Sequence, residues 1–389
     1  MSAPAYMIAA RRTQIAPRSG ALAALQADQL AAPVVRTLLQ DADMPPASVD
    51  QVFLGNALYA GGNPARLAAL RAGLPLGVPA MTVDTQCCSG LDAIILAARL
   101  IEAGAADCIL AGGAESFSRA PIRLTRPMDK NAEPVPYDRP PFAPPPFADP
   151  DLTDAAARLA SQNGVGRERQ AEFAVASHAS AIKAQGVLKR VDALDQEENP
   201  RDGFTRNLTV TTAMRAPVLA GNDTSGVTAA TTACEADGAA AVLLVSEQVW
   251  KASGKPALKI LAGRSVGGDP ADPALVPIAV AEALFDQLAL DISDFAAIEL
   301  MEAYAVQAMV TAERLGIVPS QLNRLGGALA RGHPIGASGA VLAVQLFEIM
   351  LRTSGNAGNI EKSRGLALIA AAGGLGSGLA VERVDCKGG

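Results

Sequence analysis

Residues 83–93 read Val83-Asp84-Thr85-Gln86-Cys87-Cys88-Ser89-Gly90-Leu91-Asp92-Ala93, and the rest of the chain is organised around this stretch. Between positions 91 and 103 only Asp92, Arg99 and Glu102 are polar, and they lie near one helical stripe, which predicts a buried helix. A cysteine at the N-terminus of such a helix feels the positive end of its dipole, which favours the nucleophilic thiolate. The residues alone equally allow Cys87 and Cys88 to be small buried hydrophobes.

A second motif, at 111–118, reads Ala111-Gly112-Gly113-Ala114-Glu115-Ser116-Phe117-Ser118. Together with 86–93 it resembles the nucleophile region of thiolases, acyltransferases that make or cleave 3-ketoacyl-CoA. The resemblance implies that Cys87 is the nucleophile and that Cys88 occupies a small, variable position.

The composition limits the class of protein. Half of the 389 residues are hydrophobic, enough for a large core, and the formal charge of −6 with few aromatics gives nucleic-acid binding little support. Five cysteines form no CxxC pair, which suits a reducing compartment, and two histidines make a His-based metal cage improbable. The N-terminal apolar run is too short for a secretory segment and no window is typical of a membrane span, so we expect a cytoplasmic protein that does not bind membranes.

Strand and helix patterns alternate in the first third of the chain. Strands are expected at 6–10, 49–58 and 107–113, and helices at 21–42, from the turn at 61–66 through 72, and at 91–103. This alternation predicts a mainly parallel sheet in an α/β domain.

From about residue 120 the sequence changes character, with eight prolines between 134 and 150, a density that excludes regular helix or sheet. This segment is a linker, a partner-binding segment or an ordered surface excursion, and we favour the last because Tyr137, Phe142 and Phe147 need somewhere to pack. Helices are expected at 153–163 and 167–186, and a helix-to-strand return at 226–247. Thiolases carry a loop domain here, for substrate binding and oligomer contacts.

The C-terminal half resembles a copy of the N-terminal half. Residues 295–305 match 49–58 in character and 332–346 match 86–101, while Asn56 to Cys87 and Glu302 to His333 are both separated by 31 residues. An internal duplication predicts two similar α/β units about a pseudo-twofold axis, with Cys87 and His333 meeting at one site.

The segment 323–339 contains the most specific motif, Gly332-His333-Pro334-Ile335-Gly336-Ala337-Ser338-Gly339. A histidine near a cysteine can take its proton and then donate to a developing oxyanion. The resemblance assigns both roles to His333, where a lone histidine would otherwise be read as structural. His178, on the expected 167–186 helix, corresponds to a structural residue of the family.

Two positions depart from the family pattern. The family's Asn-Glu-Ala-Phe motif reads Met301-Glu302-Ala303-Tyr304 here, and Met301 cannot hold the oxyanion-hole water that the asparagine holds. The family's second acid/base cysteine falls on Ala370, and its loss removes roughly 10²–10⁴-fold from carbon–carbon bond chemistry. Backbone N–H groups of Cys87 and Ala372 can still form an oxyanion hole.

The coenzyme A contacts are less specific. The family's Val-Thr-Ala-Gly-Asn-type turn corresponds to 227–233, where a family serine is replaced by Ala233. Arg215 is either a contact to a CoA phosphate or a solvated surface residue. Nothing in the sequence places Cys234 near the site.

The sequence therefore predicts a thiolase-like five-layered αβαβα protein: an N-terminal unit at 1–119 with 236–249, a loop domain at 120–235, and a C-terminal unit at 250–389. The expected function is an acyltransferase of fatty acid metabolism that uses acyl-CoA as substrate, binds no permanent cofactor or metal, and forms a homodimer or homotetramer. Two alternatives stay open: a thioesterase-like hydrolase, and a non-catalytic binding or scaffold subunit.

Overall fold

The computed structural model describes residues 4–59, 61–185, 188, 190–196, 200–352 and 363–386. Its strands are β1 (Tyr6–Arg12), β2 (Ala16–Pro17), β3 (Gln51–Gly55), β4 (Ala80–Val83), β5 (Cys108–Glu115), β6 (Leu124–Thr125), β7 (Val135–Pro136), β8 (Val218–Ala220), β9 (Val227–Thr228), β10 (Ala236–Val245), β11 (Ala257–Gly267), β12 (Phe295–Leu300), β13 (Arg364–Ala371) and β14 (Leu375–Val384).

The α-helices are α1 (Ala27–Ala42), α2 (Pro64–Arg71), α3 (Ser89–Glu102), α4 (Leu152–Gln162), α5 (Arg167–Ala184), α6 (Val210–Met214), α7 (Glu247–Ser253), α8 (Val276–Leu288), α9 (Ala305–Leu315), α10 (Ala328–Arg331) and α11 (Ile335–Arg352). Short 3₁₀ turns are η1 (Pro46–Ser48), η2 (Gln86–Cys88), η3 (Pro273–Leu275) and η4 (Ile292–Asp294).

Two halves of the main sheet repeat one pattern of strand pairing. The strands follow the order β12-β13-β14-β11-β1-β10-β5-β3-β4, with β2 paired to β10 off this path. In the first half β10 runs antiparallel to β1 and β5, and β3 runs parallel to β5. In the second half β14 runs antiparallel to β11 and β13, and β12 runs parallel to β13. This repeated topology confirms the predicted pair of duplicated α/β units.

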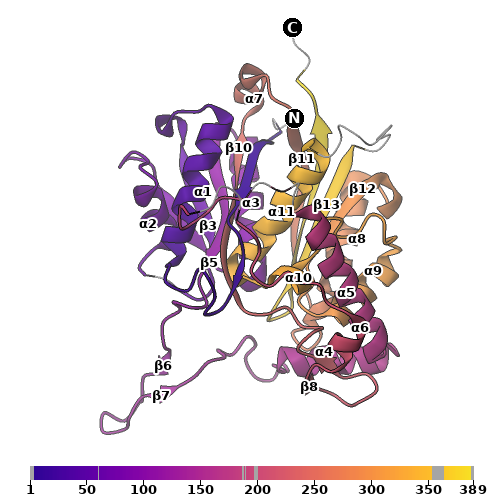
Figure 1. The fold of residues 1–389 in the computed structure, drawn as a ribbon. Helices are drawn as coiled ribbons and strands as arrows, with labels where there is room; N and C mark the ends of the chain where they lie inside the picture. The colour runs from indigo at the N-terminus through magenta and orange to yellow at the C-terminus, as the bar shows by residue number, and fades with distance from the viewer. Residues whose placement is uncertain are drawn as a thin grey trace.

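The helices complete five layers, visible in Figure 1. Helices α3 and α11 pack against each other between the two half-sheets, and their apolar residues share one buried cluster with β5, β10 and β13. Helices α1 and α2 cover the outer face of the N-terminal half, and α8 and α9 cover the outer face of the other. The residues of α3 are apolar around most of its circumference because the helix is buried from both sides. This confirms the buried helix that the sequence predicts.

Three expectations from the sequence were wrong. The sheet is mixed. Helical crossovers join β3, β4 and β5, and also β12 and β13, as parallel strands, whereas β10 returns from the loop region and enters antiparallel. The expected helix at 21–42 begins at Ala27, where Gln26 and Gln29 form a capping box. The expected helix-to-strand return at 226–247 contains strands, and the described residues there form no helix before Ser246.

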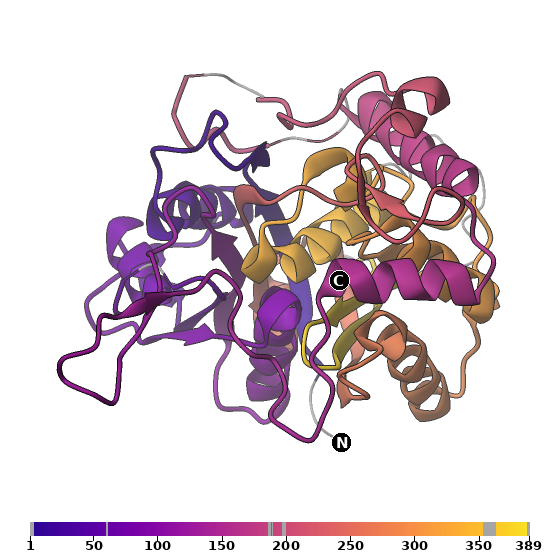
Figure 2. The ribbon, with the colours of Figure 1, turned by 90° about the horizontal axis from the view of Figure 1, so that it is seen from below.

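One part of the region from 120 to 235 packs beside the C-terminal half of the molecule, and another part projects away from it. Helices α4 to α6 and the β8–β9 pair lie next to α9, while Figures 1 and 2 both show the β6–β7 hairpin projecting away. Proline density did not exclude this two-residue strand pairing. The aromatics do not all pack, since the exposed fractions are 38% for Tyr137 and 62% for Phe147. The expected helix end at 186 lies outside the described residues.

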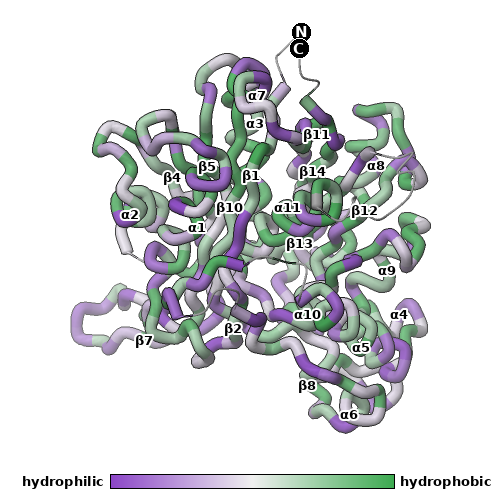
Figure 3. Tube along the Cα trace, turned by 45° about the horizontal axis from the view of Figure 1, so that its top comes forward, coloured by the Kyte–Doolittle hydropathy of each residue, from purple (hydrophilic) through white to green (hydrophobic). Residues whose placement is uncertain are grey.

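Hydrophobic residues follow the layers. Figure 3 shows them concentrated along the central strands and α11, whereas the tip of the β6–β7 hairpin is largely hydrophilic. Within the described part of the chain, no helix has the length and apolar character needed to cross a membrane.

Candidate active site

Cys87 lies in a tight turn between β4 and α3. The preceding residue, Gln86, has a positive φ of 55°, which is a strained conformation for a non-glycine residue and costs roughly 1–2 kcal/mol. Its backbone N and its side-chain Nε2 both donate to Oδ1 of Asp84, each at 3.0 Å. These bonds help to hold the turn that precedes Cys87.

Glycines let the two halves of the molecule meet at this turn. A Cβ on Gly113 would lie 2.0 Å from the carbonyl oxygen of Gly336, and a Cβ on Gly90 would lie 2.8 Å from the same oxygen. No side chain fits at such distances, so glycine is required for α3, β5 and the start of α11 to approach one another. This approach brings the turns that carry Cys87 and His333 to one place.

The two side chains form a direct contact. His333 Nε2 lies 3.1 Å from Cys87 Sγ, and His333 Nδ1 lies 2.6 Å from Ser338 Oγ. The Ser338 hydroxyl also lies 3.0 Å from the carbonyl of Pro334, to which it can donate its one proton while it accepts from Nδ1. In this arrangement Nδ1 carries the ring proton and Nε2 is free to accept the thiol proton.

Burial keeps this pair neutral. It raises the pKa of the Cys87 thiol to about 12, although the N–H groups of Ala372 and of Cys87 itself act to lower that pKa. Burial also lowers the pKa of His333 to about 4. The expectation that the helix dipole favours a thiolate was therefore wrong for the resting site. Cys87 precedes α3 within the 3₁₀ turn η2, and the loss of solvent outweighs the dipole.

The pair opens into an apolar cavity of about 120 Å³. Its lining is mostly apolar, with alanines and other apolar residues on α4, on η3, at the end of β13 and in the adjoining loops, while α9 contributes Gln307. The lining includes four positions that the sequence singled out: Ala233, Met301, Tyr304 and Ala372. It also includes Ala370. Among the described residues, no three His, Cys, Asp or Glu side chains gather as metal ligands would.

The candidate Arg215 and two residues that were not assigned to the site, Cys88 and His178, lie outside the cavity. Arg215 is exposed at the C-terminal end of α6 and is not part of the cavity lining. Cys88 is fully buried, and its sulfur lies 3.7 Å from the carbonyl oxygen of Ile369. His178 is buried outside the cavity and its Nδ1 accepts from the backbone N of Arg206.

Sequence reasoning missed two neighbours of His333. Ser338 lies 2.6 Å from Nδ1 of His333 and was detectable only as a hydroxyl in the first turn of the following helix. Cys234 lies next to it in space, because its carbonyl accepts from the backbone N of His333 at 2.8 Å. No local sequence pattern predicts that contact, because it joins segments about a hundred residues apart in the chain.

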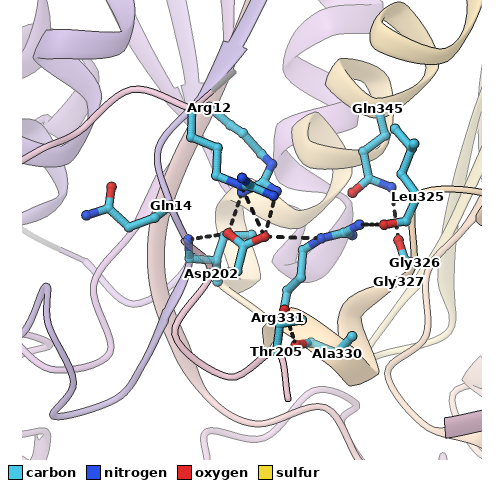
Figure 4. Close-up of polar contacts among 12 residues, drawn as sticks. Arg12, Gln14, Asp202, Thr205, Leu325, Gly326, Gly327, Ala330, Arg331 and Gln345 are labelled. Carbon is cyan, nitrogen blue, oxygen red and sulfur yellow. Dashed lines mark hydrogen bonds and ion pairs between the residues drawn. The ribbon is translucent and has the colours of Figure 1, made fainter. Parts of the chain in front are cut away.

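A buried ionic network supports the segment before His333, as Figure 4 shows. Asp202 accepts two hydrogen bonds from Arg12, at 2.7 and 2.8 Å, and lies 3.4 Å from Nε of Arg331. Arg331 also donates to the carbonyl of Leu325. The network joins β1, the loop region and α10, and so holds the His333 turn against the N-terminal half.

Comparisons with known proteins agree with this fold over nearly the whole chain. Residues 5–248 match the thiolase N-terminal domain and residues 254–383 match the thiolase C-terminal domain. The acetyl-CoA acetyltransferase of Pseudomonas aeruginosa is 36% identical, covering 97% of this chain and 98% of that protein. The putative acetyl-CoA C-acetyltransferase YhfS of Bacillus subtilis is 36% identical over 97% of this chain and 99% of its own.

The solved structures include a close match in fold. The crystal structure of the Bacillus anthracis acetyl-CoA acetyltransferase superposes with a TM-score of 0.84 at 27% identity, covering 98% of this chain and 99% of that one. The duplicated αβαβα architecture, the two matched domains and these relatives together show that the chain belongs to the thiolase family and is an acyltransferase.

Proposed function

We propose that the protein transfers acyl groups from acyl-CoA through an acyl-enzyme on Cys87. The observation that carries this proposal is the 3.1 Å contact between Cys87 Sγ and His333 Nε2 at the mouth of an apolar cavity. A thiol beside a neutral imidazole acceptor is an activated nucleophile of the kind that attacks thioesters. The two curated relatives named above carry acetyl-CoA in their names, which supports a CoA thioester as the donor.

Acylation would begin when the thioester carbonyl reaches Cys87. Sγ attacks that carbon while Nε2 of His333 takes the thiol proton. The negative charge moves to the carbonyl oxygen, where the N–H groups of Cys87 and Ala372 would stabilise it, since both act to lower the pKa of the thiol. Collapse of the intermediate expels the CoA sulfur, which receives the proton from His333, and leaves the acyl group on Cys87.

The fate of the acyl group is where this chain would differ from its relatives. A carbon acceptor must lose a proton before it can attack, and the family resemblance places that task at the position of Ala370. Alanine transfers no proton, and Met301, buried beside it, offers no hydrogen bond for an oxyanion-hole water. We therefore propose that acylation is retained and that ordinary Claisen chemistry is altered or lost.

The test is intact mass after mixing with short- and medium-chain acyl-CoAs. We expect a gain of one acyl group with release of one CoA, absent in Cys87→Ala and slowed roughly 10²–10⁴-fold in His333→Asn. Cys386→Ala is the matched control, because this partly buried cysteine lies outside the cavity and should leave the adduct unchanged.

The same experiment separates the alternatives. Free acid accumulating without a lasting adduct would identify a thioesterase-like hydrolase. Neither adduct nor released CoA with any donor would overturn the proposal and leave a non-catalytic binding or scaffold subunit.

Oligomer formation is a second part of the proposal. The projecting segment around β6 and β7 exposes large apolar side chains, among them Ile122 and Met128, which are 88% and 101% exposed in the single chain. Apolar surface of this kind is typical of a partner-binding segment. We expect a homodimer or homotetramer by analytical ultracentrifugation, and a monomer at micromolar concentration would contradict it.

A further inference from the structure

One polar side chain in the cavity beside Cys87 has no partner. Gln307 lies in the first turn of α9, is 2% exposed and lines the cavity. Neither its Oε1 nor its Nε2 has a hydrogen-bond partner among the residues that the structure describes. Burying an amide without partners costs free energy, so such a group is expected to meet one when the site is occupied.

The other polar side chains of the described lining are already paired. The hydroxyl of Thr232 donates to a backbone carbonyl at 3.0 Å, and the hydroxyl of Tyr304 lies 3.1 Å from that of Thr153. Cys87 and His333 contact each other. Gln307 is therefore the lining residue whose side-chain hydrogen bonds remain available to a ligand.

The chemistry of the lining narrows the kind of group that Gln307 can bind. A glutamine amide both donates and accepts, so a group with both capacities satisfies it best. No Lys, Arg, Asp or Glu is among the described residues that line the cavity. A charged group would be buried without a counter-ion, which is costly, whereas a neutral hydroxyl or carboxamide meets no such penalty.

We propose that the enzyme selects acyl groups carrying a neutral hydroxyl or carboxamide, which Gln307 binds while the alanines around it contact the acyl carbons. The inference rests on the proposed function, because it places the acyl group in the cavity when its carbonyl reaches Cys87.

Calorimetry with unreactive CoA thioethers tests the proposal without requiring turnover. The probes are S-butyl-, S-pentyl- and S-hexyl-CoA, each beside the analogue with a terminal hydroxyl. We expect the hydroxyl analogue to bind the wild type about 2- to 10-fold tighter than its parent for at least one chain length. Gln307→Met, which keeps the size of the side chain and removes both polar atoms, is expected to lose this preference.

Thermal unfolding without ligand gives a second readout. Because both amide atoms of Gln307 are unpaired, Gln307→Met should leave the melting temperature unchanged or raise it. The matched control is Gln170→Met, since Gln170 is fully buried outside the cavity and its Nε2 donates to two backbone carbonyls at 3.2 Å. This control should melt at a lower temperature and keep the hydroxyl preference.

The outcomes separate the two proposals. The decisive quantity is the ratio of the dissociation constants of each hydroxyl analogue and its alkyl parent. If this ratio is the same in the wild type and in Gln307→Met, the role of Gln307 alone is overturned. A fall in melting temperature for Gln307→Met with no change in that ratio would show a structural role instead. No binding of any thioether would overturn the CoA-dependent function and this inference with it.

Discussion

At the residue scale, Cys87 and His333 are held neutral by burial, which raises the pKa of one to about 12 and lowers that of the other to about 4. His333 is therefore a base at any pH above about 4, and it loses this role as the pH falls through that value. We expect the acylation rate to be level from about pH 5 to about pH 10 and to fall on the acid side. Stopped-flow release of CoA would measure this profile.

The protonation state of the thiol provides an independent check on that prediction. The ultraviolet absorbance of the wild type minus that of Cys87→Ala should contain no thiolate band at neutral pH, because the thiol ionises only near pH 12. A thiolate band at pH 7, with a bell-shaped rate profile, would show that the pair is ionised at rest.

At the scale of elements, the site depends on how closely α11 approaches β5 and α3. Gly113→Ala would place a Cβ 2.0 Å from the carbonyl oxygen of Gly336, so α11 must move and carry the His333 turn with it. We expect a loss of about 1–3 kcal/mol in the free energy of unfolding and about 10²-fold slower acylation. Urea unfolding and single-turnover mass spectrometry measure the two effects.

The control for this prediction is Gly77→Ala. Nothing lies within 4 Å of a Cβ at Gly77, so this change should leave both quantities close to those of the wild type. Acylation at the normal rate in Gly113→Ala would mean that the approach of α11 does not set the distance between the thiol and the imidazole.

At the scale of the whole molecule, Asp202 joins the N-terminal half, the loop region and the His333 segment through buried arginines (Figure 4). Burial acts to raise the pKa of Asp202, but the nearby arginine charges, Arg12 first, outweigh it and hold that pKa well below its usual range. Asp202→Asn would leave those charges uncompensated, and we expect it to cost about 3–5 kcal/mol in the free energy of unfolding at pH 7.

The pH dependence of that cost has a definite sign. Because the folded pKa of Asp202 is depressed, its stabilisation is fully present above the unfolded value of about 4 and is lost as the pH falls below it. The difference between wild type and Asp202→Asn should therefore shrink in acid. Asp272→Asn, which removes an exposed pair with Arg158, should cost at most about 1 kcal/mol, and an equal cost for both changes would contradict the role of burial.

The buried central helix and the duplicated units could be predicted from the sequence because both follow from local sequence patterns. The apolar circumference around α3 and the equal spacing from Asn56 to Cys87 and from Glu302 to His333 identified a buried helix and a duplication. Strand direction was not predictable in the same way. Whether β10 enters the sheet parallel or antiparallel depends on where the chain returns from the loop region, which no local periodicity records.

The family, the duplicated units and the two side chains that meet could all be recognised from the sequence, because motifs and spacing are local properties of the chain. The protonation state of those side chains depends on the folded molecule. Desolvation, which comes from every element packed around them, keeps Cys87 a thiol and His333 an unprotonated base. The tertiary structure likewise leaves the amide of Gln307 unpaired, because whether a side chain finds a hydrogen-bond partner depends on all the residues packed around it.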